Sequence, residues 1–399
     1  MKRTLMLTLL LAISVGANPA GPAKNNGTKQ PVFKRAGDPF AVGPMAGEPA
    51  TADLNKDGNL DLVIPCGTCC GSAPSPMSGH VQILMGNGRG GFRTAPGSPI
   101  KIGSSARKVA LGDANGDGRQ DIFVAQHDSY DVVVLIGDGG GGFRPAPSPV
   151  VAATGPRPHT HDIAAVDING DRHLDLLTTN ANDNTISALL GDGRGGFAQA
   201  PGSPFRAGRH PYDVVTTSDI NNDGKLDLIT PNLRGNAIMV MLGDGNGSFA
   251  QATGAPFAVQ TRPGYVAVAD LNRDGKQDIV ATHDDYPIVA VLLGDGMGNF
   301  KPTPESPLKP SFAVWGVSVG DVNGDGANDL VCGSQIDDGI AIMLGDGRGG
   351  FIESSTPAPR AGKMSNYVAL ADLNRDGKLD IVATSYGSGE VTVFLNTTK

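Results

Sequence analysis

One short motif occurs seven times in this sequence. Each copy has aspartate at positions one, five and nine and asparagine at position three, and successive copies begin 51 to 60 residues apart. The copies start at Asp53, Asp113, Asp167, Asp219, Asp270, Asp321 and Asp372. Self-similarity at a fixed period is typical of an array of identical supersecondary units. The 399 residues are therefore predicted to form one repeat array rather than unrelated domains.

A glycine-rich string follows each of the first six copies. It reads GNGRGGF, GDGGGGF, GDGRGGF, GDGNGSF, GDGMGNF and GDGRGGF in chain order. The seventh unit stops at Asn396, where this string should begin. Near the other end of the chain, the segment that starts at Phe33 resembles the segments that follow Phe92 and Phe197. The N-terminal segment is therefore predicted to complete the seventh unit, which closes a ring.

The pattern of apolar residues predicts the strands within each unit. In the fifth unit, residues 265–269, 278–282 and 288–293 are short apolar runs separated by Gly/Asp turns, and Phe300 opens a fourth run. Four short strands in a repeat of about 50 residues are typical of a propeller blade. Helical repeats are excluded because no apolar pattern of helical period extends over ten or more residues. We expect an all-β fold, a seven-bladed β-propeller of four-stranded blades over residues 31–399.

The first residues are typical of a secretory signal peptide. A basic start is followed by the apolar run 5–15 and by small residues up to Ala17, so cleavage is expected after Ala17 or Ala20. No other apolar run approaches the ~20 residues that span a bilayer, so no membrane span is expected. The prediction is a signal peptide over 1–17, a linker over 18–30, and a secreted protein, either extracellular or periplasmic.

The four cysteines fit an exported chain, in which disulfides are permitted. Cys66, Cys69 and Cys70 are expected to form a local staple whose pairing the sequence leaves open. Cys332 is expected to be a small buried hydrophobic residue. A structural zinc site at these cysteines would require four N or S ligands, and no second CxxC motif exists.

The aspartate loops predict calcium sites. Calcium prefers six to eight hard oxygen ligands, and the glycine at position six of six loops permits the sharp turn that brings them together. The alternative is an Asx-rich turn without an ion, but three carboxylates in nine residues would repel one another without a cation. Loop three has Arg172 in place of the glycine and is expected to hold the weakest site. The expected ligands of up to seven calcium ions are the side chains at positions one, three, five and nine and the backbone carbonyl at position seven: Asp53, Asn55, Asp57, Asn59, Asp61; Asp113, Asn115, Asp117, Arg119, Asp121; Asp167, Asn169, Asp171, His173, Asp175; Asp219, Asn221, Asp223, Lys225, Asp227; Asp270, Asn272, Asp274, Lys276, Asp278; Asp321, Asn323, Asp325, Ala327, Asp329; Asp372, Asn374, Asp376, Lys378, Asp380.

The net charge of −8 is largely explained by these loops, since three aspartates in each of seven loops make 21 of the 40 acidic residues. The acidity therefore does not indicate an acidic binding surface. It also argues against a nucleic-acid partner.

The loops DLNKDGNLDLVI, DANGDGRQDIFV and DVNGDGANDLVC resemble the calcium loops of FG-GAP and VCBS-type repeats. The resemblance covers roughly residues 31–399. It implies the seven-bladed propeller of integrin α-subunits and of many exported bacterial proteins, with calcium in the loops. The Gly-Ala-Pro of the FG-GAP motif is absent after these loops, so an integrin-like mode of ligand binding is not implied. Relatives of this architecture include adhesion modules, lectins and domains of polysaccharide lyases.

Strand parity predicts where a ligand binds. The aspartate loops and the glycine-rich turns must lie on one face, while the loops between strands two and three and the connections between blades lie on the other. The second face carries nearly all the chemical variety. Its candidate ligand-binding residues are His127, Tyr130, His159, His161, His210, Tyr212, Arg262, His283, Tyr286, Trp315 and Tyr386.

Such side chains suit stacking on sugars or hydrogen bonding to a peptide. The alternatives are that these loop residues are merely exposed, or that His161, His210 and His283 act as acid/base groups or metal ligands, with His159-x-His161 as a chelating pair. No serine elbow, HExxH or paired-carboxylate motif anchors a reaction class. The expected function is non-catalytic recognition or adhesion with a glycan or protein partner, in a monomer without a catalytic site. A carbohydrate-active enzyme, a lyase or hydrolase, is the second reading.

Overall fold

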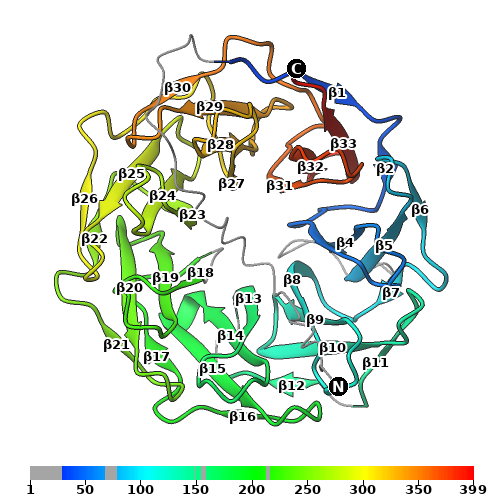
Figure 1. Ribbon diagram of the computed structural model, residues 1–399. Helices are drawn as coiled ribbons and strands as arrows, with labels where there is room; N and C mark the ends of the chain where they lie inside the picture. The colour runs from blue at the N-terminus through cyan, green and yellow to red at the C-terminus, as the bar shows by residue number, and fades with distance from the viewer. Residues whose placement is uncertain (1–28, 68–78, 148, 154–158, 213–215) are drawn as a thin grey trace, which may run out of the picture.

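The computed structural model describes residues 29–67, 79–147, 149–153, 159–212 and 216–399. Seven antiparallel sheets are arranged in a ring around a central axis (Figure 1). The signal peptide and nearly all of the linker predicted from the sequence lie outside the described residues, as do Cys69 and Cys70. Within the described residues, no helix has the length and apolar character needed to cross a bilayer.

The strands of the blades, in order from the innermost outward, follow the chain. Blade one is β3 (Ala50–Ala52), β4 (Asp61–Cys66), β5 (His80–Gly86) and β6 (Phe92–Thr94); blade two is β8 (Ala106–Gly112), β9 (Asp121–Gln126), β10 (Asp131–Gly137) and β11 (Phe143–Pro145); blade three is β13 (Thr160–Val166), β14 (Asp175–Asn180), β15 (Thr185–Gly191) and β16 (Phe197–Gln199); blade four is β18 (Thr216–Ser218), β19 (Asp227–Asn232), β20 (Ala237–Gly243) and β21 (Phe249–Gln251). Blade five is β23 (Pro263–Ala269), β24 (Asp278–His283), β25 (Val289–Gly294) and β26 (Phe300–Pro302); blade six is β27 (Val317–Gly320), β28 (Asp329–Cys332), β29 (Ala341–Gly345) and β30 (Phe351–Glu353); blade seven is β31 (Tyr367–Ala371), β32 (Asp380–Ser385), β33 (Glu390–Asn396) and β1 (Phe33–Arg35).

In five blades a further two-residue strand pairs with the third strand, so the outer strand consists of two short pieces. These strands are β7 (Ile100–Lys101), β12 (Val150–Val151), β17 (Phe205–Arg206), β22 (Phe257–Ala258) and β2 (Phe40–Ala41). The helical content of the described residues is one 3-10 turn, η1 (Ala181–Asp183). The all-β propeller expected from the repeat is thus confirmed.

The core lies between neighbouring blades. The second strand of a blade, such as β4 or β9, is buried along its whole length, because its two faces pack against the blades on either side. This explains why each of these strands has two or more consecutive apolar residues directly after its aspartate. The first strands line the axis (Figure 1), and those of adjacent blades contact each other, as β8 does with β13.

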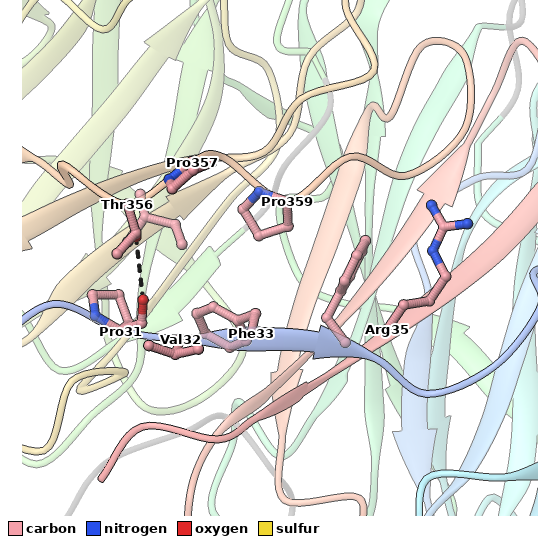
Figure 2. Close-up of a pocket in the computed structure, with 9 residues that line it drawn as sticks. Pro31, Val32, Phe33, Arg35, Thr356, Pro357 and Pro359 are labelled. Atoms are coloured by element: carbon pink, nitrogen blue, oxygen red, sulfur yellow. Dashed lines mark hydrogen bonds between the residues drawn. The ribbon is translucent and has the colours of Figure 1, made fainter.

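The ring is closed by the N-terminal strand, as the sequence predicts. Phe33 and Arg35 of β1 pair with Asn396 and Phe394 of β33, and Figure 1 shows β1 beside the C-terminus. Figure 2 shows the apolar groove at this seam, where Phe33 faces Pro359 and the Thr356 hydroxyl donates a 3.2 Å hydrogen bond to the carbonyl of Pro31. The two chain ends are therefore held in one blade.

The cysteines differ in part from the expectation. Cys332 is fully buried, as predicted. Cys66 is a free thiol, fully buried, and its Sγ donates to the carbonyl of Val42 at 3.4 Å. The expected staple through Cys66 is therefore not formed, because this position is the buried end of β4 and its side chain points into the core between blades seven and one.

Candidate functional site

The aspartate at position nine joins each aspartate loop to the neighbouring glycine-rich turn. Its Oδ2 accepts the N–H of loop residue two, and its Oδ1 accepts the N–H of the first turn residue, at 2.8–3.0 Å in all seven blades. In blade one the donors are Leu54 and Gly86, and in blade seven Asn396 donates in place of the glycine. A Cβ at Gly86 would collide with the carbonyl oxygen of Leu60, which explains the glycine that opens each turn.

Burial raises the pKa of these position-nine carboxyl groups. The pKa is raised to about 6 in Asp175, Asp278 and Asp380 and to about 7 in Asp329. The two backbone hydrogen bonds oppose this shift, and the carboxylates at positions one and five add to it. A cation beside the three carboxylates would favour the charged form.

Positions one, three and five fold each loop back on itself. In blade one, Asp53 accepts the N–H groups of Asp57 and Gly58 at 3.1 and 2.8 Å, while the Asn55 side chain accepts the N–H of Asp57 at 3.0 Å. Asp57 in turn accepts the N–H of Asn59 at 2.8 Å. The other loops form a similar set of bonds, although in loop three Asp167 accepts the N–H groups of Asn169, Gly170 and Arg172. Carboxylate and amide oxygens therefore surround one turn in each loop.

Position seven contributes a backbone N–H to position five in every loop. In three loops its cationic side chain also forms an exposed ion pair with the same carboxylate, at 3.9 Å for Arg119, 3.7 Å for Lys225 and 3.5 Å for Lys276. In blade seven the Lys378 ammonium instead donates to the carbonyl of Thr398. These cations offset part of the loop charge.

The donor set of the loops suits calcium. Three carboxylates and one amide per loop are hard oxygen ligands of the kind calcium prefers. In the part of the chain that the structure describes, no aspartate loop brings three of its carboxylates within 4.8 Å of one another. Loop three keeps the left-handed backbone at position six, since Arg172 has a φ of 72° and its N–H reaches Asp167 at 2.7 Å. An L-residue in this left-handed conformation costs about 1–2 kcal/mol.

On the opposite face, several of the predicted residues form one aromatic cluster across blades two, three and four. The ring centroids of His127, His159 and His161 lie 4.4–4.8 Å apart. Tyr212 lies 4.1 Å from His161 and 5.4 Å from His210, and it contacts Trp315 of blade six edge to face at 5.9 Å. The fold thus brings together six of the residues that the sequence singled out on this face.

Most of this cluster is buried. His127, His161 and Trp315 are each 2% exposed, so their rings face other protein groups more than solvent. Burial and the nearby histidines lower the pKa of His159 to about 3. The imidazole of His159 is therefore neutral at physiological pH.

The remaining predicted residues lie apart from this cluster. Tyr130 donates to Asp183, and Arg262 pairs with Asp284. His283 is fully buried in blade five, where its Nδ1 donates to the carbonyl of Ile288 at 3.2 Å and burial lowers its pKa to about 4. Tyr286 is exposed on the loop that follows β24.

Tyr386 lines a depression of about 610 Å³. Its walls come from the connection between blades six and seven, the loop between β32 and β33, and the segment that leads from blade seven to blade one, and include Lys363, Met364, Ser388 and Met45. The guanidinium of Arg107 lies 5.5 Å from the centroid of the Tyr386 ring. The depression therefore combines an aromatic ring, a cation and a hydroxyl on the face opposite the aspartate loops.

The sequence interpretation missed a buried charge network at the axis. The Lys108 ammonium lies 3.1 Å from Asp162 and 3.4 Å from Glu48. Burial lowers the pKa of Lys108, but the charges of Asp162 and Glu48 outweigh this effect, so its pKa is raised. The pKa of the Tyr265 hydroxyl is raised first by burial and then by the charge of Glu48.

A sequence signal for this network exists. Glu48, Lys108, Asp162 and Tyr265 each stand five residues before the first aspartate of their loop. Comparing this position across the repeat would have shown that it carries charge in three consecutive units. Bulges in β8, β13 and β23 lie next to it, and a β-bulge re-aims the side chains beside it.

The chain matches the model of the FG-GAP-like repeat in five overlapping copies, over residues 113–178, 167–230, 219–281, 270–332 and 321–383. No curated protein sequence matches the chain. Solved structures with a similar fold include a BBS1N propeller in complex with ARL6DN (TM-score 0.61, 12% identity, 91% of this chain and 96% of that chain). They also include an Agrocybe aegerita lectin that recognises non-reducing terminal N-acetylglucosamine (0.50, 21%, 94% and 87%) and the exotype rhamnogalacturonan lyase YesX (0.53, 14%, 94% and 75%). Identities this low establish the shared fold only.

Proposed function

Because the chain belongs to the FG-GAP-like repeat family, we propose that it is an exported, calcium-stabilised propeller that recognises a glycan without catalysing a reaction. Propeller relatives bind very different partners, so the fold does not choose among functions. The proposal rests on the surface opposite the aspartate loops. A lectin of the same fold that recognises N-acetylglucosamine supports the glycan class.

The observation that carries the proposal is the depression around Tyr386. Sugar sites combine an aromatic face for the C–H surface of the ring with a few polar groups for its hydroxyls. Here Tyr386 supplies the aromatic ring, while Lys363 and Ser388 supply polar atoms in the same wall. Backbone hydrogen bonds from Tyr386 to Met364 at 2.8 Å and from Gly387 to Lys363 at 3.0 Å hold the two loops together, so the wall is rigid before a ligand arrives.

Calcium is proposed to act through the opposite face. Each ion would bind the oxygens at positions one, three, five and nine and would neutralise a loop whose aspartates repel one another. Because the position-nine aspartate also bonds the turn between strands three and four, the ion would stabilise two connections of the blade together. This role is structural and is separated from the ligand by the length of the strands.

A glycan-array screen of the mature chain, with millimolar calcium and then with chelator, tests the proposal. Binding to a defined sugar that Tyr386→Ala abolishes and Tyr286→Ala preserves is the expected result. Tyr286 is a matched control because it is an exposed tyrosine in a loop of another blade. No binding by a chain shown to be folded, or binding that Tyr386→Ala leaves unchanged, would refute the assignment of this depression.

The second candidate is a carbohydrate-active enzyme. It is favoured by the histidine cluster on the same face and by a polysaccharide lyase of the same fold. The two functions differ in their products: an enzyme would shorten or unsaturate a polysaccharide, whereas a lectin would only bind it. Incubation with polysaccharides, followed by detection of new reducing ends or unsaturated products, separates the two functions.

A further inference from the structure

The histidine cluster occupies rigid positions on two neighbouring blades. His127 directly follows β9, His159 directly precedes β13, and His161 lies at the bulge of β13. The N–H of His127 donates to Ser105 at 2.8 Å and its carbonyl accepts the N–H of Thr160 at 3.2 Å, while the carbonyl of His159 accepts the N–H of Ala181 at 3.0 Å. Sites built on paired strands hold their side chains more precisely than sites on loops.

The ring nitrogens converge on one point. One ligand atom from each of the three histidines lies within 4.8 Å of the other two, and no other trio of histidine, cysteine or acidic side chains in the described residues does so. The Nε2 atoms of His159 and His161 are 2.7 Å apart. A tetrahedral zinc with Zn–N bonds of about 2.0–2.1 Å holds its ligand nitrogens about 3.4 Å apart. The observed separations bracket this value, so small side-chain rotations bring the three nitrogens onto one ion.

We propose that His127, His159 and His161 form a binding site for a zinc ion. Three neutral imidazoles suit zinc and not calcium, which prefers oxygen ligands. The trio supplies three ligands and leaves the fourth position of the ion to water or to an oxygen of a bound molecule, as in catalytic zinc sites. The proposal goes beyond the recognition function and does not depend on it, since the zinc site and the Tyr386 depression use different residues.

Asp128 is an independent observation that points to a metal. Its Oδ1 lies 2.8 Å from Nδ1 of His127. A carboxylate that accepts the Nδ1–H of a histidine fixes the tautomer in which Nε2 carries the lone pair, and metal-binding histidines almost always have such a partner. Asp128 is half exposed, so it can be changed without disturbing the core.

The site joins blade two to blade three, because His127 belongs to one and His159 and His161 to the other. Zinc bound only by the folded chain raises its stability in proportion to the logarithm of the zinc concentration. Zinc is therefore expected to raise the melting temperature further in a chain that is already saturated with calcium.

The test is titration of the intact mature chain, free of any affinity tag, with zinc chloride in excess calcium, followed by calorimetry and by metal analysis after gel filtration. One zinc per chain is expected. His159→Ala is expected to weaken binding by ~100-fold or more, and Asp128→Asn by ~10-fold or more, within the range for a group that orients a metal ligand. His173→Ala, which removes an exposed histidine from loop three, is expected to bind as the parent does.

Cobalt in place of zinc adds a spectroscopic readout, since a four-coordinate ion absorbs visible light more strongly than a six-coordinate one. A strong visible spectrum that Asp128→Asn alters and His173→Ala does not would support the site. Absence of stoichiometric zinc, or zinc that His159→Ala and Asp128→Asn both retain at parent affinity, would overturn it. Asp128→Asn keeps the test valid if His159→Ala fails to fold, because Asp128 lies outside the core.

Discussion

Replacing Lys108 with methionine tests the buried charge network at the axis. The ammonium of Lys108, in blade two, joins carboxylates from both sides: Asp162 of blade three at 3.1 Å and Glu48, which precedes blade one, at 3.4 Å. The Asp162 side chain is fully buried, while those of Lys108 and Glu48 are about one-fifth exposed. Methionine has a similar length and fills the same space, so the substitution removes the positive charge with little change in packing.

The expected loss of stability follows from the two carboxylates that remain. Removing one partner of a buried ion pair costs about 3–5 kcal/mol, because the other charge stays buried without compensation. Partial exposure of Lys108 and Glu48 lets water screen the network, so the lower end, about 3 kcal/mol, is expected.

Urea unfolding in excess calcium at pH 7 measures this loss. The double variant Lys108→Met/Asp162→Asn is expected to recover at least ~1 kcal/mol of the loss, the coupling of residues in one network. Arg360→Met is the control, since the ion pair of Arg360 with Asp338 at 2.8 Å is exposed and such pairs contribute ~0–1 kcal/mol. A Lys108→Met chain within ~0.5 kcal/mol of the parent at pH 7 would refute the assignment of a buried network.

Three further predictions concern single positions. The pKa of His283 is about 4 in the folded chain and ~6.5 when the chain is unfolded, so its contribution to stability is present above pH 6.5 and is lost as the pH falls towards 4. Between pH 7.5 and pH 5 the parent should therefore lose about 2 kcal/mol more stability than His283→Gln. Equal pH slopes of the two chains in urea unfolding would contradict this. Arg172→Gly should stabilise the chain by about 0.5–1 kcal/mol by removing a left-handed L-residue, and a decrease in the urea midpoint would refute it. Phe33→Ala should lower stability by about 1–2 kcal/mol, because the partly buried phenyl group packs where β1 closes the propeller. Val32→Ala changes a side chain that is half exposed and should have little effect. Equal melting temperatures for the two variants would argue against closure by β1.

Much of the fold could be predicted because the same pattern of strands and turns occurs seven times in the sequence. The period, the Gly/Asp turns and the displaced segment at Phe33 each depend on local sequence, and β1 pairs with β33 as expected. Strand parity also predicts which connections share a face of the propeller, since successive strands of an antiparallel blade run in opposite directions.

Burial and partners at the site could not be predicted in the same way. Trp315 and His283 read as surface loop residues, but both are almost completely buried. Trp315 packs edge to face against Tyr212, and His283 is the last residue of β24, a second strand that is buried along its whole length. Cys66 read as one half of a staple because its nearest cysteines are close in sequence, whereas the end of β4 points it into the core. Lys108 and Asp162 were missed because their relation appears only when two blades are placed side by side.

The position-nine aspartate shows a further limit of the motif. Its spacing indicated a calcium ligand, and the structure adds that both of its oxygens accept backbone N–H groups from two different connections. These bonds involve a turn about 25 residues away in blade one, which the loop sequence by itself does not indicate.

The most direct test of the account is the number of calcium ions that the chain holds, measured by metal analysis after gel filtration in calcium. The measurement is repeated after chelation, with a thermal melt of both samples. The seven loops predict six or seven ions per chain, with loop three the first to empty, and a melting temperature lower by several degrees after chelation. Fewer than one ion per chain, together with an unchanged melting temperature, would contradict the proposal that calcium holds the blades together.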